Sequence, residues 1–521
     1  MSMRAPFSSE PSLDFSVPEN RQAMLAALES VKGQLGQRYP VVINGERRET
    51  GRWITSVNPG QPDQVVGEVA KASAKDVEDA IAAGNAAFAT WRRMPVEGRA
   101  SVLFRMAGLL RQRKVELSAW LCYELDKAWD EAEGEIAEAV DFLEWYGRKA
   151  LELDQPVPLA HLPNEITDYK YLPLGVGSVI PPWNFPLAIL VGMTMAPVSV
   201  GNTALLKPAS NTPVIGYKMF ELMEEAGVPA GVVNFVPGDG SEIGDLMVEH
   251  PDVRYIAFTG SKPVGVRIFE KAAKVQPGQR WLKRVTAELG GKDAIIVDSS
   301  ADVAAAVEGI VTSAWGFQGQ KCSACSRALV HADVYDEVVA GVIERTRSLV
   351  TVGSGVSGDH IVGAVVDRNQ YDSIRGYIET GKSEGRLAYA GEVPAELEGG
   401  YYIAPHIFVD VPRTAKIARE EIFGPVLAIV KVQSFDEAMD IANDTEYGLT
   451  GSVYARDRAL LERARDEFEV GNLYFNRKCT GAMVGIHPFA GIKLSGTNSK
   501  AGGPDYLHNY VYARAIGERV Q

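Results

Sequence analysis

The stretch YLPLGVGSVIPPWNFPLAILVGMTMAPVSVGNTALL, residues Tyr171–Leu206, decides the fold because it contains no Asp, Glu, Lys or Arg. An uncharged run of this length is long enough to suggest a membrane-spanning helix. It also contains PPWNFP, Pro197 and Asn202, which would interrupt such a helix. We therefore expect buried core strands around a polar loop.

Short apolar runs alternate with helical patterns around and after this stretch. VGSVI, TALLK, VVNFV, RYIAF and AIIV are typical of strands, and TPVIGYKMFELMEEAG is typical of a helix that stops at Gly227. Such alternation predicts a parallel sheet with helices on both faces, and ligands of these sheets bind at the carboxyl ends of the strands. A second α/β region is expected from Leu289 to Arg477. The first third is expected to be mostly helical, with a capping box at Ser73 and Asp76.

Composition bounds the size and the partners of the protein. The 521 residues, 46% of them apolar, are enough for two or three domains. The net charge of −14 argues against partners such as nucleic acid or an anionic membrane. Four cysteines are too few for a disulfide scaffold and fit a reducing cytosol. The N-terminal MSMRAPFSSEPSLDFS lacks the apolar core of a signal peptide, so we expect a cytoplasmic protein.

The loop FQGQKCSACSR, from Phe317 to Arg327, contains a CxxC pair that allows three interpretations. A zinc site needs three or four ligands, but the pair supplies two and the seven histidines are scattered, so we expect no metal. A thioredoxin-like redox pair would begin a helix, whereas this one follows a helix and a glycine loop. The remaining interpretation makes Cys322 a nucleophile whose thiolate is favoured by Lys321, with Cys325 as a buried neighbour.

Three polar residues in apolar surroundings are candidate partners of this nucleophile and of a ligand. Glu288 in TAELGGKDAIIV would have its pKa raised by desolvation, as a general base needs, although a charged strand edge fits equally well. Asn184 in IPPWNFPLAI fits an oxyanion donor, although a turn residue is the commoner role. Lys207 ends a strand where a ligand phosphate or ribose would be met. In IAFTGSKPVG, a glycine before a helix N-terminus suits an anion.

Seven motifs in a fixed order, from Pro182 to Thr497, resemble the NAD(P)-dependent aldehyde dehydrogenase family: PWNFP, KPA, FTGS, ELGGK, GQKCS, EEIFGPV and PFAGIKLSGT. The resemblance implies the α/β fold of that family, with a Rossmann-like cofactor domain, an α/β catalytic domain and a small β oligomerisation flap. It places the NAD-binding domain at 1–152 and 174–288, the catalytic domain at 289–480 and the flap at 153–173 and 495–521. It also implies a homo-oligomer based on a dimer and as large as a hexamer.

The resemblance also assigns roles to individual residues. Cys322 matches the nucleophile that forms a thiohemiacetal and then a thioester, Asn184 and the Cys322 amide match the oxyanion hole, and Glu288 matches the base that activates water. The family's cofactor contacts match Pro182, Trp183, Lys207, Ser210, Gly260, Ser261, Gly265, Glu421 and Phe423. Many NAD-specific members have Glu where this chain has the uncharged Ser210. We therefore expect NAD as the cofactor, with NADP tolerated.

A finer resemblance is to the 1-pyrroline-5-carboxylate dehydrogenase subgroup. It is carried by GFQGQKCSACSR, AEGEIAEAVDFLEWYGRKA and FNRKCTGAMVGIHPFAGIKLSGTNSKAGGPDYL. It implies that glutamate semialdehyde, the open form of pyrroline-5-carboxylate, is oxidised to glutamate. Ser323 and the amides around Gly481 and Ala482 then match a carboxylate anchor, and Phe185 and Phe489 match an aromatic pair around the aliphatic chain.

Three alternatives stay open at this point. The substrate would be another semialdehyde or an aliphatic aldehyde if Ser323 and TGAMVG were not an anchor. The chain would be a non-catalytic structural member if Cys322 were unreactive. Cys325, where the subgroup commonly has Ala, would silence the enzyme if it formed a disulfide with Cys322. The chain has no room for the barrel domain of the bifunctional proline-oxidising enzymes, so a separate proline dehydrogenase would supply the substrate through solution or a transient complex.

Overall fold

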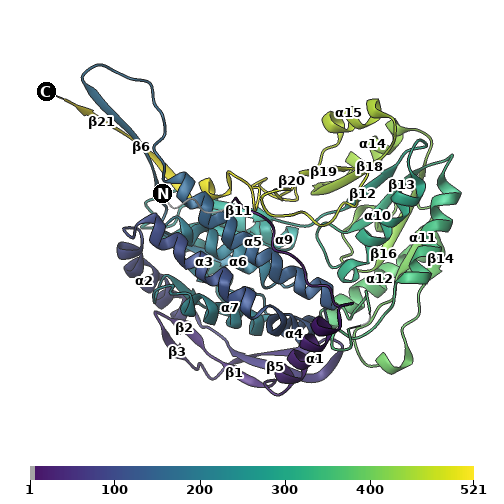
Figure 1. The fold of residues 1–521 in the computed structure, drawn as a ribbon, viewed down its shortest axis with the longest axis horizontal. Helices are drawn as coiled ribbons and strands as arrows, with labels where there is room; N and C mark the ends of the chain where they lie inside the picture. The colour runs from purple at the N-terminus through teal and green to yellow at the C-terminus, as the bar shows by residue number, and fades with distance from the viewer. Residues whose placement is uncertain (1–5, 359, 521) are drawn as a thin grey trace.

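The computed structural model describes residues 6–358 and 360–520, which form two α/β lobes and a projecting two-stranded ribbon (Figure 1). Each lobe is built on a seven-stranded sheet. In spatial order, the first sheet consists of β11 (Arg284–Glu288), β10 (Val253–Thr259), β7 (Val176–Ile180), β8 (Thr203–Leu206), β9 (Val233–Phe235), β2 (Val41–Ile43) and β3 (Glu46–Arg48). The second consists of β14 (Arg386–Ala390), β15 (His406–Val409), β16 (Val426–Val432), β13 (Cys325–His331), β12 (Asp293–Val297), β18 (Thr450–Tyr454) and β19 (Asn472–Phe475).

Both sheets are mostly parallel and buried on both faces, as the alternation of strands and helices predicts. Successive residues of a strand point to opposite faces, so Ala204 and Leu206 join one apolar core and Leu205 joins another. In the second sheet, Ile295 and Ile296 divide between two cores in the same way. Within these two sheets of the described chain, antiparallel pairing is confined to the contacts of β2, β3 and β14.

Helices cover these faces in both lobes. The first lobe contains α1 (Pro18–Lys32), α2 (Ala74–Trp91), α3 (Val96–Gln112), α4 (Lys114–Leu125), α5 (Trp129–Leu153), α6 (Ala188–Ser199), α7 (Pro213–Glu225), α8 (Asp245–Glu249) and α9 (Lys262–Ala273). The second contains α10 (Val303–Trp315), α11 (Tyr335–Leu349), α12 (Arg368–Glu384), α13 (Lys416–Arg419), α14 (Phe435–Asn443) and α15 (Arg458–Glu467). The capping box predicted at Ser73 and Asp76 begins α2, and α7 ends two residues before Gly227, whose φ is 92°.

The uncharged stretch forms strands at both ends but not in the middle. It contains β7, the PPWNFP loop, α6 and β8. The expectation of core strands is therefore wrong between residues 188 and 199, where the chain is helical. Of the residues in α6, only Ile189 is not buried, and a helix that is apolar all round has no polar face to reveal its period. No helix among the described residues is both long and apolar enough to cross a membrane.

The expectation that the first third is mostly helical is wrong between residues 37 and 70. That segment contains β2 and β3 of the first sheet and a small separate sheet of β1 (Gln37–Tyr39), β5 (Gln61–Ala70) and β4 (Trp53–Asn58). Asn44 and Gly45 connect β2 to β3 with φ values of 52° and 78°. An Asn-Gly pair directly after an apolar run is a hairpin signal, and it was available in the sequence.

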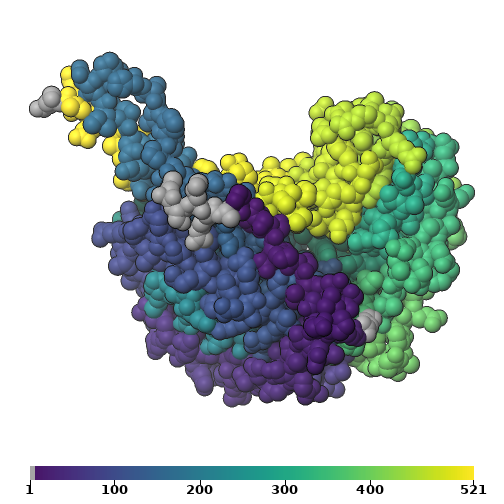
Figure 2. Space-filling view, in the orientation of Figure 1, coloured from purple at the N-terminus to yellow at the C-terminus, as the bar shows by residue number. Residues whose placement is uncertain are grey.

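The ribbon pairs two segments that are far apart in the chain. β6 (Glu165–Pro173) and β21 (Val511–Arg519) are antiparallel along their whole lengths and stand away from the first lobe (Figure 2). Residues 495–510 lie on the body instead, where Gly496 bridges to Glu288. The domain boundaries stay a prediction, and residues 1–5 and 521 of those ranges lie outside the described chain. A last small pair joins β17 (Tyr447–Gly448) to β20 (Ile492–Lys493).

Replacing the N-cap of α2 tests this description of the first lobe. In Ser73→Ala the hydroxyl that accepts from Asp76 N is lost. We therefore expect the free energy of unfolding to fall by about 1 kcal/mol. The measurement is the denaturant midpoint followed by circular dichroism. Ser101→Ala is the control, because that hydroxyl only donates to the Glu97 carbonyl within α3. Equal midpoints for the two variants would contradict the capping role.

Candidate active site

The loop that carries Cys322 has an unusual backbone. Phe317, Gln318 and Gly319 follow α10 with φ values of 49°, 55° and 68°, a left-handed run that turns the chain sharply before β13. Two glutamines fix this turn: Gln318 Nε2 donates to Ala364 O at 2.8 Å, and Gln320 Oε1 accepts from Val366 N at 3.0 Å. Cys322 thus lies between a helix and a strand in a rigid loop, and not at the start of a helix.

Asn184 reaches from the first lobe to this loop. It lies in the PPWNFP segment after β7, is 5% exposed, and donates from Nδ2 to Gln320 O at 3.0 Å. A side-chain amide has two N–H donors, so the bond to Gln320 leaves one of them for another acceptor. The predicted oxyanion donor and nucleophile are therefore neighbours across the junction of the lobes.

Burial raises the pKa values of the site around Cys322, and neighbouring carboxyl groups add to the rise. Burial raises the pKa of Glu288, at the end of β11, to about 8, as the apolar sequence around it predicts. Burial also raises the pKa of the Cys322 thiol, and the nearby Glu288, Asp293 and Glu421 raise it further. The expectation that Lys321 favours the thiolate is wrong, because its ammonium pairs with Glu131 at 2.6 Å. Burial and these carboxylates thus favour the thiol of Cys322 over its thiolate.

The other cysteines are buried bystanders. Cys325 is 1% exposed, as predicted, and its thiol donates to Arg327 O at 3.4 Å. All four cysteines are free thiols. Among the described residues, no group of three or more His, Cys, Asp or Glu side chains is arranged to hold a metal ion.

Two cavities meet at Cys322. The first has a volume of about 330 Å³, and the second has a volume of about 810 Å³. The predicted residues that line the first are Phe185, Glu288, Cys322, Ser323, Gly481, Ala482 and Phe489. Those that line the second are Pro182, Trp183, Asn184, Lys207, Gly260, Ser261, Cys322, Glu421 and Phe423. Only the nucleophile candidate is common to both sets.

The second cavity contains polar groups suited to a nucleotide. Lys207 is 6% exposed, and burial lowers its pKa to about 8. Within the described chain its ammonium donates to Pro208 O at the long distance of 3.4 Å. Such an ammonium needs a further polar partner. Glu421 accepts a hydrogen bond from Gly291 N at 3.0 Å. The rings of Trp183 and Phe423 meet edge to face with their centroids 5.4 Å apart.

Ser210 and Gly265 are not among the residues that line this cavity. Gly265 lies inside α9, where an added Cβ would be 2.2 Å from Leu289. The glycine thus allows α9 to approach residue 289 closely. Ser210 lies in the turn between β8 and α7 and is half-buried.

The first cavity has a wall of backbone amides. Arg477 Nη2 donates to the carbonyls of Thr480 and Gly481 at 3.0 and 3.1 Å. No peptide bond in the described chain is cis, so each N–H points away from the carbonyl of the same peptide. The amides of Gly481 and Ala482 therefore point away from Arg477. Both residues line the cavity, where such donors suit a carboxylate.

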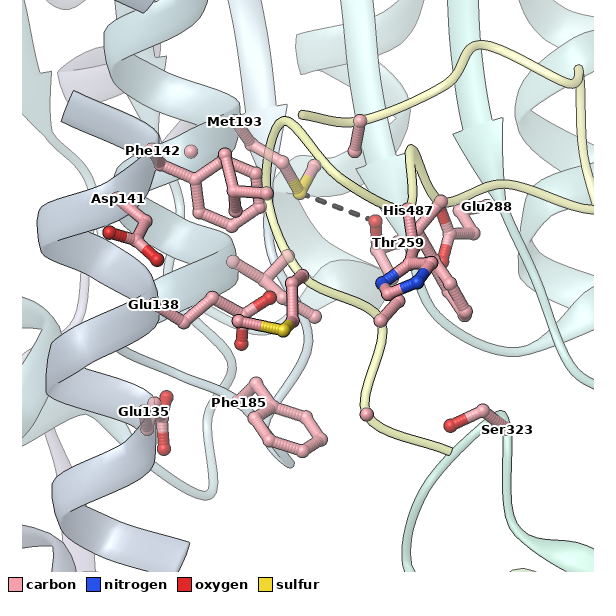
Figure 3. A pocket seen from close by; sticks show the side chains of 18 of the residues that line it. Glu135, Glu138, Asp141, Phe142, Phe185, Met193, Thr259, Glu288, Ser323 and His487 are labelled. Carbon is pink, nitrogen blue, oxygen red and sulfur yellow. Dashed lines mark hydrogen bonds between the residues drawn. The ribbon is translucent and has the colours of Figure 1, made fainter. Parts of the chain in front are cut away.

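The opposite wall is acidic, and the sequence analysis missed it. Figure 3 shows Glu135, Glu138 and Asp141 along α5, on the side of the pocket opposite Ser323 and Glu288. Burial raises the pKa of Glu138 to about 7, with Glu135 adding to the shift, and burial raises that of Asp141 to about 6. The signal was the acidic repeat 131, 135, 138 in DEAEGEIAEAVDFLEW, which follows one helix face among apolar neighbours.

The fold and this site agree with what the chain resembles among known proteins. The model of the aldehyde dehydrogenase family matches residues 46–516, and the chain belongs to that family. It is 54% identical over 516 residues to a 1-pyrroline-5-carboxylate dehydrogenase of Geobacillus thermodenitrificans (strain NG80-2), covering 99% of this chain and all of that one.

Two solved structures show the same similarity. The 1-pyrroline-5-carboxylate dehydrogenase from Thermus with bound NAD has a TM-score of 0.97 and 49% identity, and all of both chains is covered. Proline utilization A (PutA) from Bdellovibrio bacteriovorus has a TM-score of 0.97 and 44% identity, covering 99% of this chain and 53% of that one. The likeness therefore extends over the whole of this chain.

The raised pKa of Glu288 predicts a pH dependence for thioester hydrolysis. As the expected general base, Glu288 would accept a proton from water only when ionised, so the hydrolysis rate should fall about tenfold per pH unit below pH 8 and level off above it. Single-turnover kinetics of the preformed thioester isolate this step from the Cys322 thiol. Glu288→Gln should be slow at every pH, whereas the exposed Glu469→Gln should match the wild type. A rate that is constant from pH 6 to 8 would contradict the role of Glu288.

Proposed function

We propose that this chain oxidises L-glutamate γ-semialdehyde, the open form of 1-pyrroline-5-carboxylate, to L-glutamate with NAD, the second step of proline catabolism. The observation that carries the proposal is the pairing of walls in the first cavity. Ser323 lies across the cavity from an acidic helix (Figure 3), and Gly481 and Ala482 line the same cavity. An amino-acid head group carries both the carboxylate and the ammonium that these two walls complement. The names of the relatives in this family support the same substrate.

We assign each catalytic step to one of these residues. The Cys322 thiol loses its proton to water, and its Sγ attacks the aldehyde carbon, while the free N–H of Asn184 and the Cys322 amide stabilise the negative oxygen. NAD, when bound, accepts the hydride that leaves this carbon. The thioester that remains on Cys322 is attacked by water, and Glu288 takes the proton from that water. The thiol is then released with the carboxylate product.

The head group of the substrate is recognised at the far end of the cavity. Its carboxylate binds the Ser323 hydroxyl and the amides of Gly481 and Ala482, and its ammonium faces Glu138 and Asp141. A bound ammonium favours the ionised forms of these acids and so offsets the rise in pKa that burial causes. The aliphatic part of the chain lies between the rings of Phe185 and Phe489.

Cofactor selection is set by the second cavity. In this proposal Lys207 binds a ribose or phosphate oxygen and Glu421 binds the nicotinamide ribose, and both line the cavity. Gly260 and Ser261 precede the N-terminus of α9, which suits an anion. NADP is tolerated because the uncharged Ser210 does not repel a 2′-phosphate. Ser210 and Gly265 act from outside the cavity lining.

The assembly and location follow from the same family. We infer a cytoplasmic, dimer-based homo-oligomer, as large as a hexamer, in which the β6–β21 ribbon contacts another subunit. The four free thiols fit a reducing compartment. A separate proline dehydrogenase supplies the substrate, through solution or a transient contact.

Ser323→Ala tests the substrate assignment. Loss of one hydrogen bond to a charged carboxylate should lower kcat/KM for pyrroline-5-carboxylate about 10- to 100-fold. The rate with propanal, which has no head group, should stay unchanged. NADH formation at 340 nm measures both.

Ser326→Ala is the matched control, because that hydroxyl lies close by in the chain and is directed at Asp293 O, outside the cavity. Equal turnover of pyrroline-5-carboxylate and propanal by the wild type, with no effect of Ser323→Ala, would contradict the substrate assignment. The protein would then be an aldehyde dehydrogenase that acts on another substrate. An intact fold with no turnover of any aldehyde would leave a non-catalytic member.

A further inference from the structure

A fully buried lysine lies directly behind the site and touches none of the proposed reacting atoms. Lys127 follows α4, and its side chain is 0% exposed. Its ammonium is 4.3 Å from the ring centroid of Phe185 and 4.3 Å from that of Phe317. These two rings meet edge to face with their centroids 6.1 Å apart, so the cation lies in a cage with two aromatic walls.

The two rings belong to the two segments that form the reaction centre. Phe185 follows Asn184 in the PPWNFP segment, and Phe317 begins the left-handed turn that leads to Cys322. The Asn184–Gln320 hydrogen bond joins the same segments a few residues further on. One buried cation thus contacts both the segment of the oxyanion donor and the segment of the nucleophile.

The counter-ion of Lys127 extends this connection. Glu135 Oε2 is 2.5 Å from the ammonium, and Glu135 Oε1 accepts from Leu187 N at 2.7 Å and Ala188 N at 3.1 Å, at the start of α6. The carboxylate therefore ties the lysine to the helix that follows the PPWNFP segment. Both charges are buried, and each is satisfied by the other and by groups of these segments.

The residue before the lysine is also held in place, through its side-chain carboxylate. Asp126, with φ 51°, accepts from Gly355 N at 2.6 Å and Ala364 N at 2.8 Å. Ala364 O in turn accepts from Gln318 in the nucleophile loop. The cage is therefore held on its far side by the residues that hold the left-handed turn.

We propose that Lys127 is a positioning residue that fixes Asn184, Phe185 and Cys322 relative to one another through its cation cage and its pair with Glu135. A buried ion pair contributes little to stability compared with apolar side chains of similar volume, so a role in geometry accounts better for its presence. Misplacement of reacting groups by an ångström lowers rates about 100-fold. The inference rests on the proposed function for the roles of Asn184 and Cys322.

The double variant Lys127→Met/Glu135→Gln tests the proposal without leaving a buried unpaired charge. The amide oxygen introduced in place of the Glu135 carboxylate can still accept from the start of α6, so we expect a folded enzyme. Its kcat should fall about 100-fold with both pyrroline-5-carboxylate and propanal, because the damage lies at the groups that every aldehyde uses. NAD affinity, measured by fluorescence titration, should stay within about twofold, since the lysine, its counter-ion and the two rings do not line the cofactor cavity.

The matched control is Lys114→Met/Glu133→Gln. This pair is also buried, joins α4 to α5 at 2.8 Å, and touches neither aromatic ring. It should lose a similar amount of stability and keep its kcat within about twofold of the wild type. Phe317→Leu, which removes one wall of the cage, should lower kcat in its own right and add little to the Lys127→Met/Glu135→Gln variant.

Two results would overturn the proposal: full kcat in the Lys127→Met/Glu135→Gln variant, or a loss in kcat as large in the control pair. If the first variant does not fold, full kcat in Phe317→Leu would overturn it alone. Failure of the substrate assignment would give a different result. The wild type would prefer propanal, and the variants would still lose kcat with propanal.

Discussion

The hydrogen bond from Asn184 Nδ2 to Gln320 O is the contact on which the site depends, because it joins the two lobes at the reacting centre. The first lobe supplies the residues at the carboxyl ends of β7, β10 and β11: the Asn184 segment, Gly260 and Glu288. The second supplies Cys322 on the loop before β13. Neither sheet contains a complete site. The chemistry arises only where the strand ends of one sheet meet the nucleophile loop of the other.

The electrostatics of the junction favour protonated groups. Burial raises the pKa values of Cys322, Glu288 and Glu138 together, and the carboxylates reinforce one another. Nearby lysines oppose this rise only in part: Lys127 and Lys321 act on Glu138, and Lys500 acts on Glu288, but burial outweighs them. A bound ammonium group favours the ionised forms of these carboxyls. The raised pKa of Glu288 places the working range of the proposed base in mildly alkaline solution.

The sequence predicted the parts of the fold and site that have local signals. The capping box at Ser73, the parallel strands and the apolar setting of Glu288 are each visible in a few neighbouring residues, and family motifs supplied the remaining contacts. The prediction failed where packing overrides local pattern. α6 is buried almost all round, so its composition cannot distinguish a helix from a strand. The predicted effect of Lys321 on the Cys322 thiolate was wrong because its ion-pair partner, Glu131, is 190 residues away in the sequence.

Groups that act from behind the site were the hardest to foresee. The cage around Lys127 brings together residues from positions 127, 135, 185 and 317, and no short motif contains any two of the rings and the cation. The direction of the Gly481 and Ala482 amides depends on bonds from Arg477 to neighbouring carbonyls. Such features follow from tertiary structure, and the fold had to be known before they could be found.

Mass spectrometry of the covalent intermediate tests the central claim most directly. The Glu288→Gln enzyme is mixed with pyrroline-5-carboxylate and NAD, quenched with acid and digested. The account predicts a glutamyl adduct on the peptide that carries Cys322, and on neither Cys122 nor Cys479. Absence of any adduct while NADH forms, or an adduct on another cysteine, would contradict it.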